Sequence, residues 1–557
     1  MIRTIGNLDM NLTHDVCIVG AGAAGLTIAA DLMGKGLRIL VLEAGSERSD
    51  KRSQQVYEGE IADPAVHPKI DQYRVRALGG TSRIWGGRSI PFDAIDFEKR
   101  DWLPYSGWPF ARDALEPYYP GALLAAEAGA HAHDPASALP DRPASLVRGL
   151  DGEEIVTTIE RFSRPTNFWA RYGGALTAAP DVDMVSQAPV VSIRLTANGK
   201  SVDHLTALGP DGKAHKVRAR FYVIAMGGLE TTRLLLASND VSPNGVGGET
   251  GHLGRYYMSH LCATAATATF SGPPGDVAWD YDQDTAGIYL RRRLWITEPA
   301  QRAKHIMNTT FRTHLPDVGD PAHGDPILSA MFLVKDMVLY EYARKFSERQ
   351  ASWGDRGRHV LNIATQPARL ARFGWNWVRK RNLASRKLPS VVLGSAQNRY
   401  PMEFHAEQAP NPDSRLTLLD SKDALGMPRL KVDWRTSALD IESLHRAHDT
   451  LATALSTTGT GRLAFDPQTL EVKAKTGIVG GHHLGTTRMS IDPRDGVVDA
   501  DCKVHGVENL FIASASVFPT SGQANPTLTI LALALRLSAH LRKSLSTTTR
   551  SAGLSRG

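Results

Sequence analysis

The clearest pattern of apolar and polar positions lies near the amino terminus, over residues 14–45. A short β-branched run at 15–19 predicts a strand, and an Ala/Leu-rich stretch ending near Met33 predicts a helix. Gly34 and Gly36 then supply a turn before a second apolar run that ends at Glu43. This order predicts a βαβ unit, the building block of a parallel sheet.

Similar strand-then-helix patterns recur at 220–240 and 505–545, which indicates a discontinuous α/β domain. The apolar run 528–537 is too short to span a bilayer and contains Arg536, so it predicts a buried helix. Between about 265 and 470 short strand-like runs alternate with turns. This middle part favours an α+β domain built on an antiparallel sheet.

Size and composition fit this division. A chain of 557 residues and 60.5 kDa is expected to form two domains. Its three cysteines have neither zinc-site nor disulfide spacing, and residues 1–15 lack the apolar core of a secretory signal. We therefore expect a cytoplasmic protein. The net charge of +6 comes from one segment, 341–390, which contains twelve Lys and Arg and three acids. The rest of the chain has no excess of basic residues, so its charge does not indicate nucleic-acid binding.

The turn after the first strand carries the sequence G-x-G-x-x-G at Gly20, Gly22 and Gly25. Such glycines permit a tight turn, close approach of a pyrophosphate and close helix–strand packing. The helix amino terminus favours phosphate, and Glu43 at the end of the second strand can accept hydrogen bonds from a ribose. Together these features predict a dinucleotide site.

The stretch GGHHLGTTRM (480–489) raises the question of what two adjacent histidines do. Adjacent side chains diverge on a strand or a helix, and no Cys or Glu lies at ligand spacing, so we expect no metal site. One of the two could act as a general base, since imidazole titrates near neutrality, or both could simply be packed in the interior. Asn525 precedes Pro526, and we expect it to cap a helix starting there.

Five further motifs occur in a family-specific order: GGTSRIWGG (79–87), MGGLETTRLLLAS (226–238), AEQAPNPDSRLTL (406–418), GGHHLGTTRM and VHGVENLFIASASVFPTSGQANPTLTILALALRL (504–537). With the βαβ unit, they resemble the glucose–methanol–choline (GMC) family of FAD-dependent oxidoreductases. The similarity is greatest to the bacterial branch of pyranose oxidases and glycoside 3-oxidases (3-dehydrogenases). It implies an FAD-binding Rossmann-like domain (1–110, 185–262 and 470–557) and a substrate domain (111–184 and 263–469) with a basic insertion (341–390).

The resemblance also implies roles for particular residues. The family pattern H-x-x-G-T falls on His482, as base near the flavin, with Asn525 as its partner; His483 is one residue out of register and remains the alternative. Gln408 and His405 are candidate substrate residues. Ile84 stands where some sugar oxidases carry a flavin-tethering histidine, so the FAD is expected to be non-covalent. The implied cofactor residues are Gly20, Gly22, Ala23, Ala24, Gly25, Glu43, Ala44, Gly80, Thr81, Ser82, Trp85, Gly86, Val191, Ala225, Pro526 and Thr527.

The resemblance implies oxidation of a secondary hydroxyl of a sugar or glycoside to a ketone, with hydride passing to flavin N5. Two alternatives stay open: a non-sugar alcohol (aryl, sterol or polyol) as substrate, or a flavoprotein that docks on a membrane or lipid-linked glycan. The second alternative rests on 358–389, whose Leu370, Phe373, Trp377 and Val378 could share one helical face among basic residues. A lid over the substrate opening is the other interpretation of this segment. Oxygen, a quinone or a cytochrome could accept the electrons.

Overall fold

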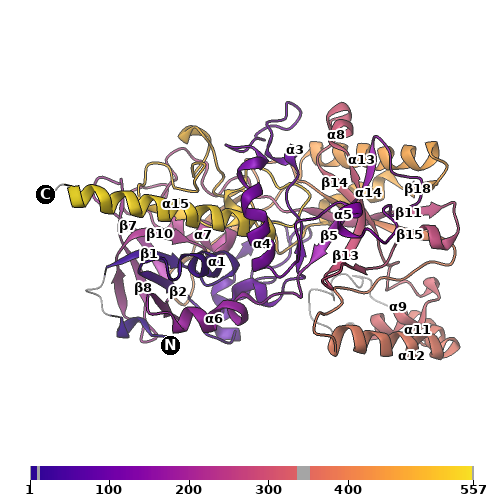
Figure 1. The fold of residues 1–557 in the computed structure, drawn as a ribbon, viewed down its shortest axis with the longest axis horizontal. Helices are drawn as coiled ribbons and strands as arrows, with labels where there is room; N and C mark the ends of the chain where they lie inside the picture. The colour runs from indigo at the N-terminus through magenta and orange to yellow at the C-terminus, as the bar shows by residue number, and fades with distance from the viewer. Residues whose placement is uncertain (1, 9–12, 335–351, 555–557) are drawn as a thin grey trace.

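In the computed structural model, which describes residues 2–8, 13–334 and 352–554, one half of the molecule is built on a five-stranded parallel sheet (Figure 1). Its order is β19-β10-β1-β2-β6. The predicted βαβ unit is confirmed, with Val16 of β1 in register with Ile39 of β2 and Phe221 of β10. The strands are β1 (His14–Val19), β2 (Ile39–Leu42), β6 (Val182–Val185), β10 (Ala219–Ile224) and β19 (Leu510–Ile512).

Apolar helices cover this sheet, because its strands are buried on both faces. The predicted apolar helix is α15 (Thr527–Leu554), which packs against α1 (Ala23–Leu32) and α4 (Tyr119–Ala125) and lies along this half in Figure 1. Two more helices pack here, α6 (Phe168–Ala178) and α7 (Gly227–Ala237). The three strands β7 (Val190–Leu195), β8 (Val202–Leu208) and β9 (Ala214–Val217) form a separate small sheet.

The other half contains the predicted antiparallel sheet, with the order β18-β11-β15-β14-β13-β5-β4 and β12 paired to β13. These strands are β4 (Arg88–Ser89), β5 (Ile155–Phe162), β11 (Leu261–Phe270), β12 (Asp282–Gln283), β13 (Tyr289–Ile296), β14 (Thr309–Thr313), β15 (Arg399–Ala406) and β18 (Gly461–Phe465). Helices α13 (Ala438–Thr457) and α14 (Pro467–Thr476) pack on it. Short helices α2 (Lys51–Gln54), α3 (Ala94–Phe97), α5 (Pro135–Ala138) and α8 (Glu298–Lys304) lie in the connections.

The hairpin of β16 (Arg415–Lys422) and β17 (Pro428–Asp433) turns at Gly426, as its sequence predicts, but forms its own sheet with β3 (Glu60–Ile61). This small sheet is tied to the parallel half by the buried guanidinium of Arg233 on α7. Arg233 contacts Asp423 at 2.6 Å and donates to the carbonyl of Pro428 at 2.7 Å. The pairing matters because a buried guanidinium left without its carboxylate partner would be strongly destabilising.

The basic insertion forms a helical layer at one end of the molecule, away from both termini (Figure 1). Its described part consists of α11 (Trp353–Thr365), α12 (Pro367–Trp377) and a π-helical turn, Val378–Asn382, and it packs on α9 (Pro326–Leu333), which precedes it. Pro367 separates α11 from α12, because proline is tolerated in the first turn of a helix but not in its interior. Phe373 and Trp377 do share a face, with ring centroids 6.1 Å apart. Residues 341–351 of the predicted insertion lie outside the described part of the chain.

Two predictions need correction. Strand β6 was placed by sequence in the substrate domain, but it joins the parallel sheet beside β2, because α6 returns the chain to that edge. Strand β4 was placed in the FAD-binding domain, but it pairs with β5 of the antiparallel sheet. Helix α15 begins at Thr527, and the Asn525 side chain is bonded to Arg88 and His482, as described below. None of the described helices has the length and hydropathy needed to cross a membrane.

Candidate active site

The glycine-rich turn after β1 has the geometry of a dinucleotide site. Gly20 has φ = 106°, and a Cβ there would lie 2.5 Å from the carbonyl oxygen of Ala225. A Cβ at Gly25 would lie 2.0 Å from the Gly20 oxygen, so this position must be glycine for the helix to pack on the turn. At Gly22, by contrast, a Cβ would meet nothing within 4 Å. The turn is therefore closed on its protein side and open where a pyrophosphate would lie.

Glu43 fixes the second side of this turn. Its carboxylate accepts hydrogen bonds from the backbone N–H groups of Ala21 at 2.8 Å and Gly45 at 2.7 Å. Burial raises the pKa of Glu43, while these N–H donors and Arg76 oppose the rise. Each carboxylate oxygen keeps a second lone pair, so the group can hold the turn and still accept from a ribose hydroxyl.

The loop 79–87 lies against the turn. A Cβ on Gly80 would be 3.2 Å from the Gly22 Cα, and Gly79 packs on Trp169. Ser82 is buried and donates to the Gly79 carbonyl at 2.6 Å, while Trp85 donates to the Thr166 carbonyl at 2.8 Å. The loop is thus rigid on one side, whereas Thr81 and Gly86 are exposed on the other.

Several of the remaining predicted cofactor residues border the same region. Ala225 follows β10 and donates its N–H to the Val19 carbonyl at 2.7 Å, beside the glycine turn. Helix α1 begins at Ala23 without a side-chain cap, which leaves its amino terminus available to an anion. Ala24 lies in α1 and Ala44 follows Glu43, whereas Val191 lies in β7 and Pro526 and Thr527 lie at the start of α15 beside Asn525.

A pair of substitutions separates cofactor binding from folding. The Cβ added by Gly22→Val meets no protein atom within 4 Å, so the protein is expected to fold and to lose at least about tenfold in FAD affinity. Gly25→Val collides with the Gly20 backbone and is expected to prevent a stable fold. Flavin content after purification and the melting temperature of the flavin-free protein measure the two effects. Normal flavin retention in Gly22→Val would contradict the assignment of this turn.

The second part of the site is a pair of side chains from distant segments. The Asn525 amide nitrogen lies 3.1 Å from Nε2 of His482. The Asn525 oxygen accepts from Arg88 at 3.4 Å, and Arg88 in turn lies 3.3 Å from the Glu160 carboxylate. The side chains of His482, Asn525 and Arg88 are half-buried, so a small ligand can reach them.

His260 determines which nitrogen of His482 carries the proton. Nε2 of His260 lies 3.1 Å from the carbonyl oxygen of Ser521, which can only accept, so this nitrogen is the donor. Nδ1 of neutral His260 is then an acceptor for Nδ1 of His482, 2.8 Å away. His482 therefore carries its proton on Nδ1, and its Nε2 presents a free lone pair toward Asn525.

The predicted substrate residue His405 stacks behind His260, with centroids 4.8 Å apart, and its Nδ1 donates to the Gln523 carbonyl at 2.6 Å. Gln408 is fully buried and does not contact these histidines. Its amide accepts from the Ser259 N–H at 2.8 Å and from the Trp434 indole at 2.9 Å. Both residues thus contribute to the structure around His482.

The tandem histidines are separated by their environments. His483 lies against Tyr257, with centroids 6.2 Å apart, and is packed over Gly228, whose added Cβ would lie 2.9 Å from that of His483. Burial lowers the pKa of His483 to about 3, with Arg74 and His67 adding to the effect. Only His482 faces Asn525.

His482 is held in its neutral form. Burial lowers its pKa well below the usual 6.5, and His260, His483 and Arg88 lower it further. Burial likewise lowers the pKa of His260 to about 3. The His482 imidazole is therefore unprotonated at neutral pH and can accept a proton.

The neutral form of His482 determines how kcat/KM is expected to depend on pH. Since the free base must be neutral, kcat/KM is expected to stay constant as pH falls from 8 and to decline only well below 6.5. Arg88→Gln removes a cation that opposes protonation, so the acid limb should move to higher pH. A pH profile of kcat/KM in both proteins checks this. An acid limb near 6.5 in the wild type, or no shift in the variant, would contradict it.

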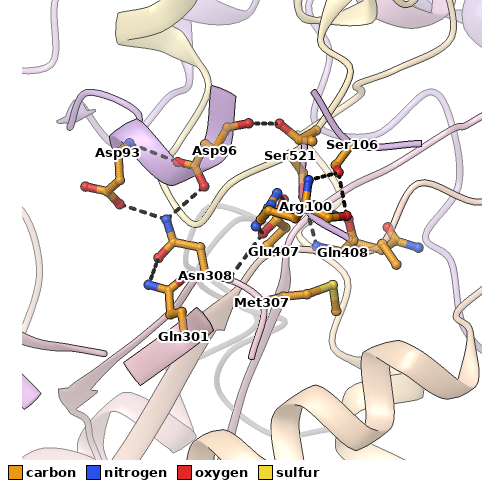
Figure 2. Close-up of polar contacts among 12 residues, drawn as sticks. Asp93, Asp96, Arg100, Ser106, Gln301, Met307, Asn308, Glu407, Gln408 and Ser521 are labelled. Carbon is orange, nitrogen blue, oxygen red and sulfur yellow. Dashed lines mark hydrogen bonds and ion pairs between the residues drawn. The ribbon is translucent and has the colours of Figure 1, made fainter. Parts of the chain in front are cut away.

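A buried polar cluster holds the loop that carries Asn525 (Figure 2). Arg100 and Glu407 form a fully buried two-bond ion pair, at 2.7 and 2.6 Å. The Asn308 amide donates to both Asp93 and Asp96 at 2.8 Å.

Three residues of the loop are bonded to this cluster. The Thr520 hydroxyl donates to the Asp96 carbonyl, the Ser521 hydroxyl accepts from the Gln408 N–H, and the Gln523 amide donates to the Asp93 carboxylate. The backbone at 520–525 is thus fixed, including the two carbonyls that hold His260 and His405.

Sequence reasoning missed His260 and Arg88, which complete the site. Each lies far along the chain from its partner, by 222 residues for His260 and His482 and 437 for Arg88 and Asn525. Neither stands in a local motif with a chemical signature. Only the pairing of β11 and β4 with the antiparallel sheet brings them to the loop 520–525.

Two known protein families match the chain. Residues 15–331 match the FAD dependent oxidoreductase family, and residues 410–534 match the GMC oxidoreductase family. The chain belongs to the FAD-dependent oxidoreductases, and its carboxyl-terminal part is that of a GMC oxidoreductase. The glycine turn, the uncapped α1 and the open side of loop 79–87 fit FAD as its cofactor.

Two curated relatives align along nearly the whole chain. One is the fructose dehydrogenase large subunit of Gluconobacter japonicus, 23% identical over 94% of this chain and 97% of the relative. The other is 6'''-hydroxyparomomycin C oxidase of Streptomyces lividus, 24% identical over 94% and 90%. Among solved structures, pyridoxine 4-oxidase from Mesorbium loti shares the fold, with a TM-score of 0.54, 18% identity, and coverage of 95% of this chain and 99% of that one.

Proposed function

We propose that the protein oxidises a secondary hydroxyl of a sugar or glycoside to a ketone. The observation that carries this proposal is the 3.1 Å contact between Nε2 of His482 and the Asn525 amide nitrogen, together with the 2.8 Å contact between Nδ1 of His482 and Nδ1 of His260. FAD, when bound, supplies the hydride acceptor at its N5 atom. His482 supplies the base that such chemistry requires.

His482 takes the hydroxyl proton of the substrate on Nε2, which makes the carbon-bound hydrogen a better hydride. The Asn525 amide donates to the same oxygen and fixes the direction of the C–H bond. Arg88, bonded to the other end of that amide, places a positive charge where the substrate oxygen becomes negative. Glu160 balances the charge of Arg88 and keeps it in place.

The choice of a sugar over another alcohol is supported by the relatives, whose names include a fructose dehydrogenase and two aminoglycoside oxidases. The side chains around His482 are polar, which suits a substrate with several hydroxyls. The secondary position follows the resemblance to glycoside 3-oxidases. A 2-methyl-1,2-propanediol dehydrogenase is also among the relatives, so simple polyols are the competing substrates.

Anaerobic bleaching of the enzyme-bound flavin tests the substrate class without assuming an acceptor. The panel contains alkyl and aryl glycosides, free sugars, an aryl alcohol and a small diol at equal concentrations. We expect glycosides or sugars to bleach the flavin at least about tenfold faster than the simple alcohols. Bleaching by the simple alcohols alone would overturn the sugar assignment and leave the family unchanged.

The proposed electron acceptors are oxygen, a quinone or a cytochrome. Mixing the reduced enzyme with each in turn distinguishes them by the rate of flavin reoxidation. Rapid reoxidation by oxygen identifies an oxidase, while a rate that only the quinone or cytochrome reaches identifies a dehydrogenase. Contact of the basic insertion with a membrane is a separate proposal and rests on different residues.

A further inference from the structure

The insertion from 352 to 389 has a one-sided charge. It contains nine Lys and Arg against a single acid, Asp355. Asp355 is used to cap α11 through Ser352. Arg369 is paired with Asp325 on α9 at 2.5 Å. The other basic side chains of the insertion form no ion pair within the described part of the chain.

The same segment exposes large apolar side chains. Of the fourteen that are exposed in the described residues, six lie between 353 and 383. Trp353 is 86% exposed, Trp375 67% and Leu383 73%. The other three are Val360, Leu361 and Val378. Exposed tryptophan and leucine beside unpaired cations are typical of helices that lie in a membrane interface.

An open cavity of about 450 Å³ lies where the insertion meets the turn between β12 and β13. Four cationic side chains line it: Arg164, Arg379, Lys380 and Arg386. No acid is among its lining residues, which otherwise include Gln283, Tyr289 and Ser385.

The charges around this cavity are incompletely balanced. Glu127 is bonded to Arg164 at 2.5 Å, and Arg386 donates to the Glu127 carbonyl at 3.0 Å. Arg379 and Lys380 have no such partner among the described residues. Asp280 is the acid whose charge interacts with that of Lys380, but the two form no ion pair. The cavity therefore suits an anionic group such as a phosphate.

We propose that the insertion binds the surface of an anionic phospholipid bilayer, with lipid phosphates in this cavity. The exposed tryptophans and leucines enter the headgroup region, and the basic side chains meet the negative surface. Two signals, apolar insertion and charge attraction, are what stable peripheral binding requires. An acidic protein partner would satisfy the cations but would leave Trp353, Trp375 and Leu383 without a matching apolar phase.

Co-sedimentation of the full-length, FAD-loaded protein with vesicles tests this proposal. We expect binding to vesicles that contain about one-third phosphatidylglycerol, little binding to pure phosphatidylcholine, and release at high salt. Arg379→Ala/Lys380→Ala should lower the bound fraction at least about fivefold. Trp375→Ser/Leu383→Ser should also lower it, but what binding remains should keep its salt dependence.

The matched control is Lys216→Ala/Lys473→Ala, which removes the same charge from exposed positions on β9 and α14. Flavin absorbance and melting temperature confirm that each variant is folded. Equal binding to both vesicle types, or equal loss in the control, would overturn the proposal. Stabilisation by inorganic phosphate without any vesicle binding would assign the cavity to a soluble phosphate ligand and would also overturn it. Either result leaves the proposed oxidation untouched, because no substrate is involved.

Discussion

His482→Ala is expected to slow anaerobic flavin reduction by a glycoside by about 10²–10⁴-fold, the range that a general base contributes. The reason is that hydride leaves the substrate carbon readily only as its hydroxyl proton is removed, and no other described side chain offers a free basic nitrogen to Asn525. Stopped-flow bleaching at saturating substrate measures the effect. FAD content should be close to normal, because His482 lies away from the glycine turn.

His483→Ala is the matched control, since it removes the same side chain one residue away. Its ring packs on Tyr257 and makes no contact with Asn525. We expect a lower melting temperature from the lost packing, with flavin reduction within about tenfold of the wild type. If His483→Ala instead abolished reduction and His482→Ala did not, the family register would be misplaced by one residue.

His260→Phe is expected to produce the second-largest loss, about 10²-fold in flavin reduction. Phenylalanine keeps the ring packed between His405 and His482 but cannot accept the hydrogen bond from His482 Nδ1. His482 can then carry its proton on Nε2, the nitrogen that must be free. His260 is thus a positioning residue, whose effect passes through the tautomer of His482.

A purely structural role for His260 is distinguished by rescue. His260→Asn retains an acceptor near the position of Nδ1 and should recover at least about tenfold over His260→Phe, although it packs less well. The rate should therefore follow hydrogen bonding and not the melting temperature. If both variants lost activity in proportion to their stability, the tautomer argument would fail.

The cofactor half of the molecule could be predicted because its signals are local. Gly20, Gly22 and Gly25 lie within one turn, and Glu43 follows at the end of the next strand, so one βαβ unit specifies them all. Gly20 and Gly25 are required because any side chain there would lie 2.5 and 2.0 Å from a backbone oxygen, whereas Gly22 leaves space open beside the turn. Such steric requirements are visible in sequence.

The catalytic cluster could be predicted only in part. The motif at 480–489 and Asn525 lie in the carboxyl-terminal 80 residues and match a family pattern. Arg88 lies in β4 and His260 immediately precedes β11, both strands of the other half, and sheet pairing brings them to the loop 520–525. The expected capping role of Asn525 was also wrong, since its side chain is directed to Arg88 and His482. Local propensity cannot anticipate such tertiary contacts.

The sheets that β4 and β6 join could not be predicted from the sequence. The chain crosses between the two halves at β4 and again at α6–β6, short elements with weak periodicity of their own. The basic insertion was recognised from its composition, but the cavity beside Lys380 depends on packing against the turn between β12 and β13.

A single-turnover experiment tests the central claim most directly. The FAD-loaded enzyme and a glycoside are mixed without oxygen, and the product is trapped by borodeuteride and examined by mass spectrometry. We predict one keto-glycoside per flavin reduced in the wild type, with deuterium at a ring carbon, and almost none from His482→Ala in the same time. A product labelled at a primary carbon, or equal yields from both proteins, would contradict secondary-hydroxyl oxidation with His482 as the base.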